Sequence, residues 1–181
     1  MKLMIASDIH GSAKWCQKLL DRFEEESPEK ILLLGDILYH GPRNDLPDEY
    51  APKKVIKMLN DIKDSIMCIR GNCDTEVDQM VLEFPIMSTT MSMFLDGHFI
   101  YASHGHVENP DNPPYLTKKQ ILLNGHTHVA MCKEYDNFIY MNPGSVSIPK
   151  NETKRGYMIY ENHRFEWKDL DGNSYMKYDM D

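Results

Sequence analysis

Five short segments of the chain carry side chains that can bind metal ions, and each follows an apolar run. The segments are Asp8-Ile9-His10, Gly35-Asp36, Gly71-Asn72, Ser103-His104-Gly105-His106 and Gly125-His126-Thr127-His128. Five of the eight histidines of the chain fall within them. Burying so many polar side chains at strand ends is costly unless partners or metal ions compensate them. A Gly-Asp or Gly-Asn pair alone is typical of an ordinary turn, so the combination predicts the metal site.

The spacing within two of these segments predicts how the side chains point. In extended backbone, residues i and i+2 project to the same side. We therefore expect Asp8 with His10, and His126 with His128, to face one metal cluster. The glycines that accompany the segments suit turns in which the backbone bends sharply or passes close to a ligand.

The first part of the chain predicts the elements that place these residues. Apolar runs at 2–6, 30–34 and 65–69 are typical of buried strands, and apolar spacings of three and four predict helices at 13–26 and 51–62. This β-α-β-α-β order indicates a parallel sheet covered by helices. In open α/β sheets, sites gather beyond the carboxyl ends of the strands, where the polar segments stand.

The second part of the chain predicts short strands with few helices. Asp96-Gly97 between apolar runs predicts a hairpin of 89–95 with 99–103. Further strands are expected at 121–124, 129–134, 138–141 and 157–160. The tail after residue 170 is polar and rich in Tyr and Asp, and we expect no chemistry from it. The whole indicates an α/β fold with two sheets and helices outside, as one domain over 1–181.

Composition and charge narrow the class of protein. The chain has 181 residues, of which 41% are hydrophobic and 27% charged, which is typical of a globular protein. It lacks a signal-peptide pattern and an apolar run of the ~18 residues of a membrane span, so we expect a cytoplasmic location without membrane association. Its four cysteines have no Cys-x-x-Cys spacing, which favours free thiols. The net charge of −8 argues against a nucleic-acid surface but allows a small anionic substrate at a metal site.

The ordered segments resemble the calcineurin-like metallophosphoesterase family. The resemblance rests on Asp8-x-His10-Gly11, Gly35-Asp36, Gly71-Asn72, His104-Gly105 and Gly125-His126-x-His128, extended by Asn142-Pro143-Gly144-Ser145. Around these, Ile37-Leu38-Tyr39-His40-Gly41-Pro42-Arg43-Asn44, Cys73-Asp74 and Val146-Ser147 are similar to the bacterial YfcE-type phosphodiesterases. We expect the turn at 142–145 to support the site from behind rather than to contact substrate.

The resemblance implies a fold, a metal centre and a reaction. The implied fold is a two-sheet β-sandwich flanked by helices, in four layers α/β/β/α. Asp8, His10 and His128 would bind a first ion, Asn72, His104 and His126 a second, and Asp36 would bridge both. The resemblance favours Mn²⁺, whereas the ligand types alone also suit Zn²⁺ and Fe, and Ni stays open. Two such ions ~3.5–4 Å apart form a bridging hydroxide that attacks a phosphoryl group.

One position departs from the wider family and leaves the proton donor open. The family often carries His after Gly-Asn, where it protonates the leaving group, and this chain has Cys73. A thiol with an ordinary pKa of about 8.5 is a poorer acid near neutrality than imidazolium at about 6.5. Either leaving groups that need little protonation are favoured, or His106 or His40 supplies the proton. Cys73 could equally be a packed residue without a chemical part.

Substrate contacts are expected in the loop after Asp36. Arg43 can grip a phosphate with two parallel hydrogen bonds, and Asn44 and His40 are further candidates, although a loop arginine can also be merely solvated. The loss of the family histidine favours a small phosphodiester substrate over a phosphomonoester. A protein-binding scaffold of the same fold, like a retromer subunit with decayed ligand positions, is a third reading, which the seven filled ligand positions disfavour. A dimer is compatible with the sequence, and no feature decides it.

Overall fold

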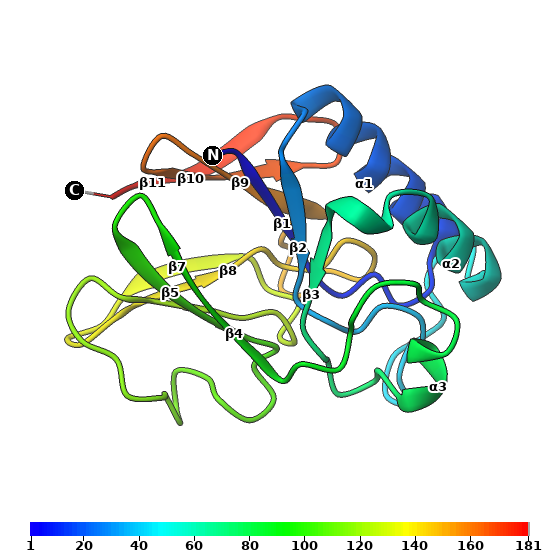
Figure 1. The fold of residues 1–181 in the computed structure, drawn as a ribbon, viewed down its shortest axis with the longest axis horizontal. Helices are drawn as coiled ribbons and strands as arrows, with labels where there is room; N and C mark the ends of the chain where they lie inside the picture. The colour runs from blue at the N-terminus through cyan, green and yellow to red at the C-terminus, as the bar shows by residue number, and fades with distance from the viewer. Residues whose placement is uncertain (181) are drawn as a thin grey trace.

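The structure is a computed structural model that describes residues 1–180, and two β-sheets packed face to face form its centre (Figure 1). The strands are β1 Leu3–Ala6, β2 Lys30–Leu33, β3 Ile66–Cys68, β4 Thr90–Leu95, β5 His98–Ser103, β6 Ile121–Leu123, β7 Met131–Glu134, β8 Ile139–Asn142, β9 Gly156–Glu161, β10 Arg164–Asp169 and β11 Ser174–Asp179. The helices are α1 Ala13–Glu26, α2 Pro52–Asp61 and α3 Glu76–Gln79, with a 3₁₀ turn at Lys63–Ser65.

Both sheets are mixed, with a parallel centre. The first has the order β11-β10-β9-β1-β2-β3, in which β1, β2 and β3 are parallel. The second has the order β4-β5-β6-β8-β7, in which β5, β6 and β8 are parallel. The parallel strands of each sheet end on the same edge, so the segments that follow them meet there.

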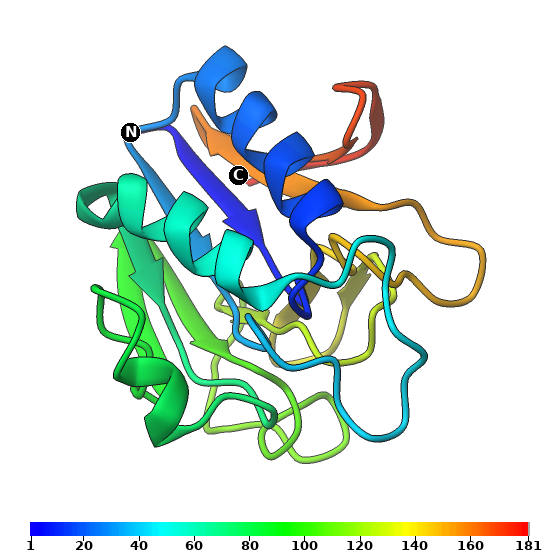
Figure 2. The ribbon, with the colours of Figure 1, turned by 90° about the vertical axis from the view of Figure 1, so that its right-hand side faces the viewer.

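Helices α1 and α2 cover the outer face of the first sheet and lie side by side across it (Figure 2). Ser12 caps α1 by accepting a hydrogen bond from the Trp15 N–H, and Ser27 ends it in a left-handed conformation. Helix α2 begins at Pro52, a position where a backbone N–H would have no acceptor within the helix, so the lack of an N–H in proline costs no hydrogen bond. Both helices bury apolar side chains against alternate residues of β1 and β2, such as Met4 and Ile31.

The other face of the first sheet packs on the second sheet. Ile5 and Leu32 from the first sheet meet Ile100, Leu123 and Met141 from the second. On the outer face of the second sheet, a loop carrying Leu116 covers Leu122 and Tyr140, and no helix of residues 1–180 lies there. The predicted sandwich of two sheets flanked by helices is confirmed, with both long helices on one side.

Two strands extend the first sheet beyond the predicted elements. β9, β10 and β11 form an antiparallel meander at its edge, joined to β1 through β9. Phe165 and Trp167 are fully buried between the sheets, and Trp167 donates its ring N–H to the Asn142 carbonyl at 2.7 Å. Of the tail after residue 170, β11 completes the sheet edge, and Met180 joins the same core cluster. Within residues 1–180, no helix is long and apolar enough to cross a membrane.

Candidate metal centre

The seven predicted ligands all follow strands of the two sheets, and hydrogen bonds tie their loops together. The His10 N–H donates to the Asp36 carbonyl at 2.9 Å, and the His126 N–H donates to Asp8 Oδ2 at 3.0 Å. The Cys73 N–H donates to Asp36 Oδ1 at 2.8 Å. Loops from both sheets are thereby fixed around one point.

The backbone brings these side chains together by a route that the sequence did not predict. Asp8, His10, Asp36, His126 and His128 all have positive φ, between 49° and 65°. The expectation of extended backbone at these positions is therefore wrong, because left-handed turns aim the side chains instead. Such a conformation is unfavourable for residues other than Gly, and clusters of it are typical of functional sites.

Two glycines are required by close approach to the carboxylates. A Cβ on Gly71 would lie 2.1 Å from Asp36 Oδ1, and one on Gly125 would lie 1.9 Å from Ser7 Oγ and 2.9 Å from Asp8 Oδ2. No side chain fits at either position without moving the candidate ligands.

The turn after β8 holds Asp8 from behind, as expected. Ser145 Oγ and Ser147 Oγ both donate to the Asp8 carbonyl, at 2.8 and 3.1 Å. Asn142 donates to the Gly125 carbonyl at 2.8 Å. This turn thus fixes the backbone of two ligand-bearing loops without facing the cavity.

Ring nitrogens and carboxylate oxygens converge at the centre of these loops. His128 Nε2 lies 3.3 Å from Asp8 Oδ1 and 3.2 Å from His10 Nε2. His10 Nε2 lies 3.5 Å from Asp8 Oδ1 and 3.7 Å from Asp36 Oδ2. On the other side, His104 Nε2 lies 3.4 Å from Asp36 Oδ2 and 3.1 Å from Asn72 Oδ1.

The orientation of the three buried histidines leaves their Nε2 atoms facing inward. Each Nδ1 donates to a backbone carbonyl: His10 to Tyr39 at 2.7 Å, His104 to Leu34 at 2.6 Å and His128 to Ile148 at 2.8 Å. Such bonds fix the tautomer of a metal-binding histidine and present its Nε2 lone pair. Asp8 Oδ1 is buried and makes no hydrogen bond with a described residue. This set of acceptors fits a cation.

The pKa values of His104 and Asp8 also indicate that positive charge is favoured at the centre of the cluster. Burial favours neutral imidazole, yet the contacts with Asp36 and Asp8 raise the pKa of His104 to about 9. Burial likewise disfavours ionised Asp8, but His10 and His128 hold its pKa well below the usual value. The carboxylates thus favour the protonated imidazoles of His10 and His104, at atoms that can bind a metal ion in place of a proton.

His126 and Asn72 stand at the border of this buried cluster. The His126 ring lies 5.1 Å from that of His104, and burial followed by the charge of His104 lowers the pKa of His126 to about 4. His126 is therefore neutral and available as a ligand near pH 7. Asn72 turns its Oδ1 toward His104 and donates its Nδ2 to Cys73 Sγ at 3.2 Å.

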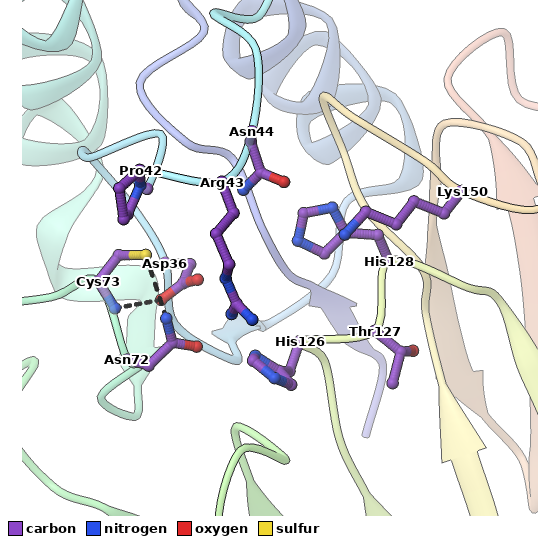
Figure 3. Close-up of a pocket in the computed structure, with 11 residues that line it drawn as sticks. Asp36, Pro42, Arg43, Asn44, Asn72, Cys73, His126, Thr127, His128 and Lys150 are labelled. Atoms are coloured by element: carbon purple, nitrogen blue, oxygen red, sulfur yellow. Dashed lines mark hydrogen bonds between the residues drawn. The ribbon is translucent and has the colours of Figure 1, made fainter.

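A cavity of about 320 Å³ opens on the cluster (Figure 3). Its wall includes Asp36, Asn72, Cys73, His126 and His128. Arg43 and Asn44, which the sequence analysis gave as candidate substrate contacts, also line it, and Arg43 reaches into the middle of the group. This volume suits a small ligand rather than a macromolecule.

The three candidate proton donors lie in different places. Cys73 lines the cavity, and burial, together with nearby Asp36, raises the pKa of its thiol, so the thiol keeps its proton. His106 lies outside this cavity, in a second hollow, with its ring 5.5 Å from that of His104. His40 also lies outside the cavity wall, between the rings of Tyr39 and Tyr50.

Two residues that shape this site were not predicted from the sequence. Asp74 is 1% exposed and accepts the backbone N–H groups of Asp36, Ile37 and Gly71, at 2.7–2.8 Å. It clamps the loop after β2 to the loop after β3, and its place in Gly71-Asn72-Cys73-Asp74 was the only signal. Lys150 lines the cavity from the loop after β8, where no motif pointed to it.

Comparison with known proteins defines the class to which this fold and site belong. The sequence profile of the calcineurin-like phosphoesterase superfamily domain matches residues 1–164, and the chain belongs to that family. The prediction of a hydrolase acting on phosphoric ester bonds is confirmed at this level.

Among individual proteins, the chain is similar to phosphodiesterase YfcE of Escherichia coli strain K12. The two are 43% identical over 162 residues, which cover 90% of this chain and 88% of the relative. The solved structure of YfcE, described as a phosphoesterase from E. coli, matches with a TM-score of 0.96 over 100% of both chains, at 39% identity. The structure of Vps29 with Zn²⁺ from Entamoeba histolytica matches with a TM-score of 0.64 over 100% of both chains, at 19% identity, which shows a common fold.

Proposed function

We propose that this protein is a phosphodiesterase that hydrolyses a small phosphodiester with two divalent metal ions. The observation that carries the proposal is the convergence of Nε2 atoms of His10, His104 and His128 on two buried carboxylates, within 3.3–3.7 Å. Such a set of acceptors is unfavourable without positive charge among them. The name of the similar E. coli protein supports the choice of a diester.

The proposed ligands divide into two groups around one carboxylate. Asp8, His10 and His128 form a compact group that suits one ion. Asp36 approaches both His10 and His104, and Asn72 and His126 lie beside His104, which supports a second ion that shares Asp36. Nitrogen and oxygen ligands of this kind suit Mn²⁺, Zn²⁺ or Fe, and the family resemblance favours Mn²⁺.

When bound, two divalent ions supply an activated water and positive charge for the phosphoryl oxygens. The chain contributes the geometry: the Nδ1–carbonyl bonds hold the rings, and Asp74 holds the two loops that carry Asp36 and Asn72. Arg43 and Asn44 bind and orient the substrate phosphate from the cavity wall.

The site offers only poor candidates for the general acid that protonates the leaving group. The Cys73 thiol lines the cavity but holds its proton tightly, so it is a poor general acid. Substrates whose leaving group departs with little protonation, such as aryl oxides, are therefore favoured. His106 is the remaining imidazole near the cluster and would have to act from the neighbouring hollow.

The direct test uses metal-stripped protein with Mn²⁺, Zn²⁺, Ni²⁺ or Mg²⁺ added back. Hydrolysis of bis(p-nitrophenyl) phosphate is compared with that of p-nitrophenyl phosphate, for the wild type and for Asp36→Ala. We expect metal-dependent turnover of the diester that the substitution abolishes. A preference for the monoester would overturn the diester assignment, and a lack of turnover with every metal would favour a scaffold.

A further inference from the structure

Two cationic side chains face the cavity from opposite walls. Arg43 comes from the loop after β2, and Lys150 comes from the loop after β8, on the same side of the cavity as His128 in Figure 3. Both side chains are exposed, and neither forms an ion pair or side-chain hydrogen bond with a residue of 1–180. Of the two residues, only Arg43 was expected from the sequence to contact substrate.

Hydrogen bonds to the backbone carbonyl of His128, a candidate metal ligand, hold the backbone of Lys150 in place. Its N–H donates to the His128 carbonyl at 3.0 Å, and Thr153 Oγ1 donates both to the Lys150 carbonyl at 2.8 Å and to the His128 carbonyl at 3.3 Å. Just before it, the Ile148 carbonyl accepts His128 Nδ1 at 2.8 Å. The Cα of Lys150 is thus fixed relative to the cluster, unlike that of a lysine in a loop without such hydrogen bonds.

The opposite wall is a closed turn. The Asn44 N–H donates to the Gly41 carbonyl at 3.4 Å, and Asn44 Nδ2 donates to the His40 carbonyl at 2.8 Å. Arg43 stands within this turn, so its guanidinium is also presented from a defined position. The second N–H of the Asn44 amide stays available to a ligand.

Arg43 and Lys150 have no acidic partner among the described residues, in contrast to two lysines in neighbouring segments. Lys154, in the same loop as Lys150, pairs with Asp169 at 3.1 Å, and Lys14 pairs with Asp48 at 3.1 Å. Among the described residues that line the cavity, Asp36 is the one carboxylate, and it is 2% exposed and turned to the histidines. A protein of net charge −8 thus keeps two free cations at this rim.

A plain diester needs less positive charge than this cavity offers. Its phosphate carries one negative charge, and the proposed two divalent ions with Asp8 and Asp36 already leave a positive centre to receive it. Arg43 is enough to orient that phosphate. A further fixed cation on the far wall suits a second anionic group on the same substrate.

We propose that Lys150, facing Arg43 across the cavity, binds a second phosphate group of the substrate. The substrate class is then a phosphodiester that bears an additional terminal phosphate on one of its two esterified groups. This inference rests on the proposed function and narrows its substrate. A terminal phosphate carries more negative charge than the diester phosphate and therefore suits the Lys150 ammonium, while Arg43 and Asn44 stay with the phosphate that is hydrolysed.

The test compares two esters that differ by one phosphate: the p-nitrophenyl ester of thymidine 5′-phosphate, and the same ester with a 3′-phosphate. The readout is the ratio of their kcat/KM values in Mn²⁺-loaded protein. We expect the wild type to prefer the bisphosphate ester about fivefold, mainly through KM, and Lys150→Met to bring the ratio near one. Higher ionic strength should reduce the wild-type preference.

The matched control is Lys53→Met, which removes the same charge from an exposed position on α2 away from the cavity. It should keep the wild-type ratio. A wild-type ratio near one, or an unchanged ratio in Lys150→Met, would overturn the second phosphate site while leaving the phosphodiesterase in place. If neither ester is hydrolysed with any metal, the proposed function fails, and this inference fails with it.

Discussion

A partly buried carboxylate and a fully buried one, in different regions of the molecule, show how this chain separates stability from function. Glu26, at the end of α1, has a side chain 14% exposed and accepts Lys168 at 2.6 Å, Lys2 at 3.0 Å and the Tyr157 hydroxyl at 3.1 Å. Asp8, at the end of β1, has a fully buried side chain, and its Oδ1 has no hydrogen-bond partner in residues 1–180. Lysine side chains compensate the charge of Glu26, whereas Asp8 faces the imidazole rings of His10 and His128, whose Nε2 atoms can bind a metal ion together with it.

The backbone differs between the two regions in the same way. The meander β9–β11 has regular antiparallel pairing and buries large apolar side chains such as Trp167. The loops at the candidate metal centre place several non-glycine residues at positive φ and surround them with acceptors. Unfavourable backbone conformations thus occur at the site where ligand binding can offset their cost in free energy. Apolar packing in the rest of the molecule keeps it folded.

The largest expected effect is at the carboxylate that both ligand groups share. Asp36→Asn should lower kcat/KM for bis(p-nitrophenyl) phosphate by roughly 1,000-fold or more, because it weakens both proposed ion sites at once. It should also abolish the rise in melting temperature that Mn²⁺ gives the wild type. A variant that keeps both the metal-dependent stabilisation and the activity would contradict the assignment.

A smaller effect is expected at the residue that positions Asp36. Asp74→Asn keeps the shape of the side chain but turns an NH₂ group toward a backbone N–H, so one of the three accepted bonds is lost. We expect a 10–100-fold loss of metal affinity or activity, as for other residues that support metal ligands. Calorimetric titration with Mn²⁺ measures this loss. Unchanged metal affinity would show that the clamp does not matter to the site.

At Glu26, we expect a substitution to change stability and not activity. Glu26→Gln should lower the free energy of unfolding by about 1 kcal/mol, because it removes the charge that Lys2 and Lys168 share. Turnover of the diester at 25 °C should stay at the wild-type level. Asp61→Asn is the matched control, since its exposed pair with Lys57 should contribute less. Loss of activity without loss of stability in Glu26→Gln would break the separation between the two regions.

The same carboxylate predicts a pH dependence of stability. Burial opposes ionisation of Glu26, but Lys168 and Lys2 overcome it and lower its pKa from the ordinary 4.5. Its contribution is therefore complete above pH 4.5 and is lost as the pH falls through the lower, folded-state pKa. Denaturant unfolding at a series of acidic pH values should show a shallower decline for Glu26→Gln. Parallel curves for both proteins would refute this contribution.

The elements of the fold were largely readable from the sequence, because their periodicity is local. The helices α1 and α2 and the strands up to β9 follow from apolar spacing and turn residues. The last two strands were not predicted, because charged and polar residues make up half or more of each, although Phe165 and Trp167 alternate with charged residues in β10. The short helix α3 starts at a capping box of Thr75 and Asp78, a signal too brief to predict alone.

The segments of the candidate site could be predicted from the sequence, but their geometry could not. Strand ends and residue types pointed to five segments, and the family resemblance implied the seven ligand positions within them, which stay a prediction. The left-handed turns at Asp8 and His10 depend on hydrogen bonds to the loop after β2, which no local pattern reveals. The position of Lys150 at the cavity could not be predicted for the same reason, since it depends on a hydrogen bond to the His128 carbonyl and not on neighbouring residues in the sequence.

The most direct test of the central proposal is anomalous diffraction at the manganese edge from crystals grown with saturating Mn²⁺. We predict two peaks per chain, one beside Asp8, His10 and His128 and the other beside Asn72, His104 and His126, with Asp36 in contact with both. A single peak, or peaks away from these residues, would contradict the two-metal site on which the proposed function depends.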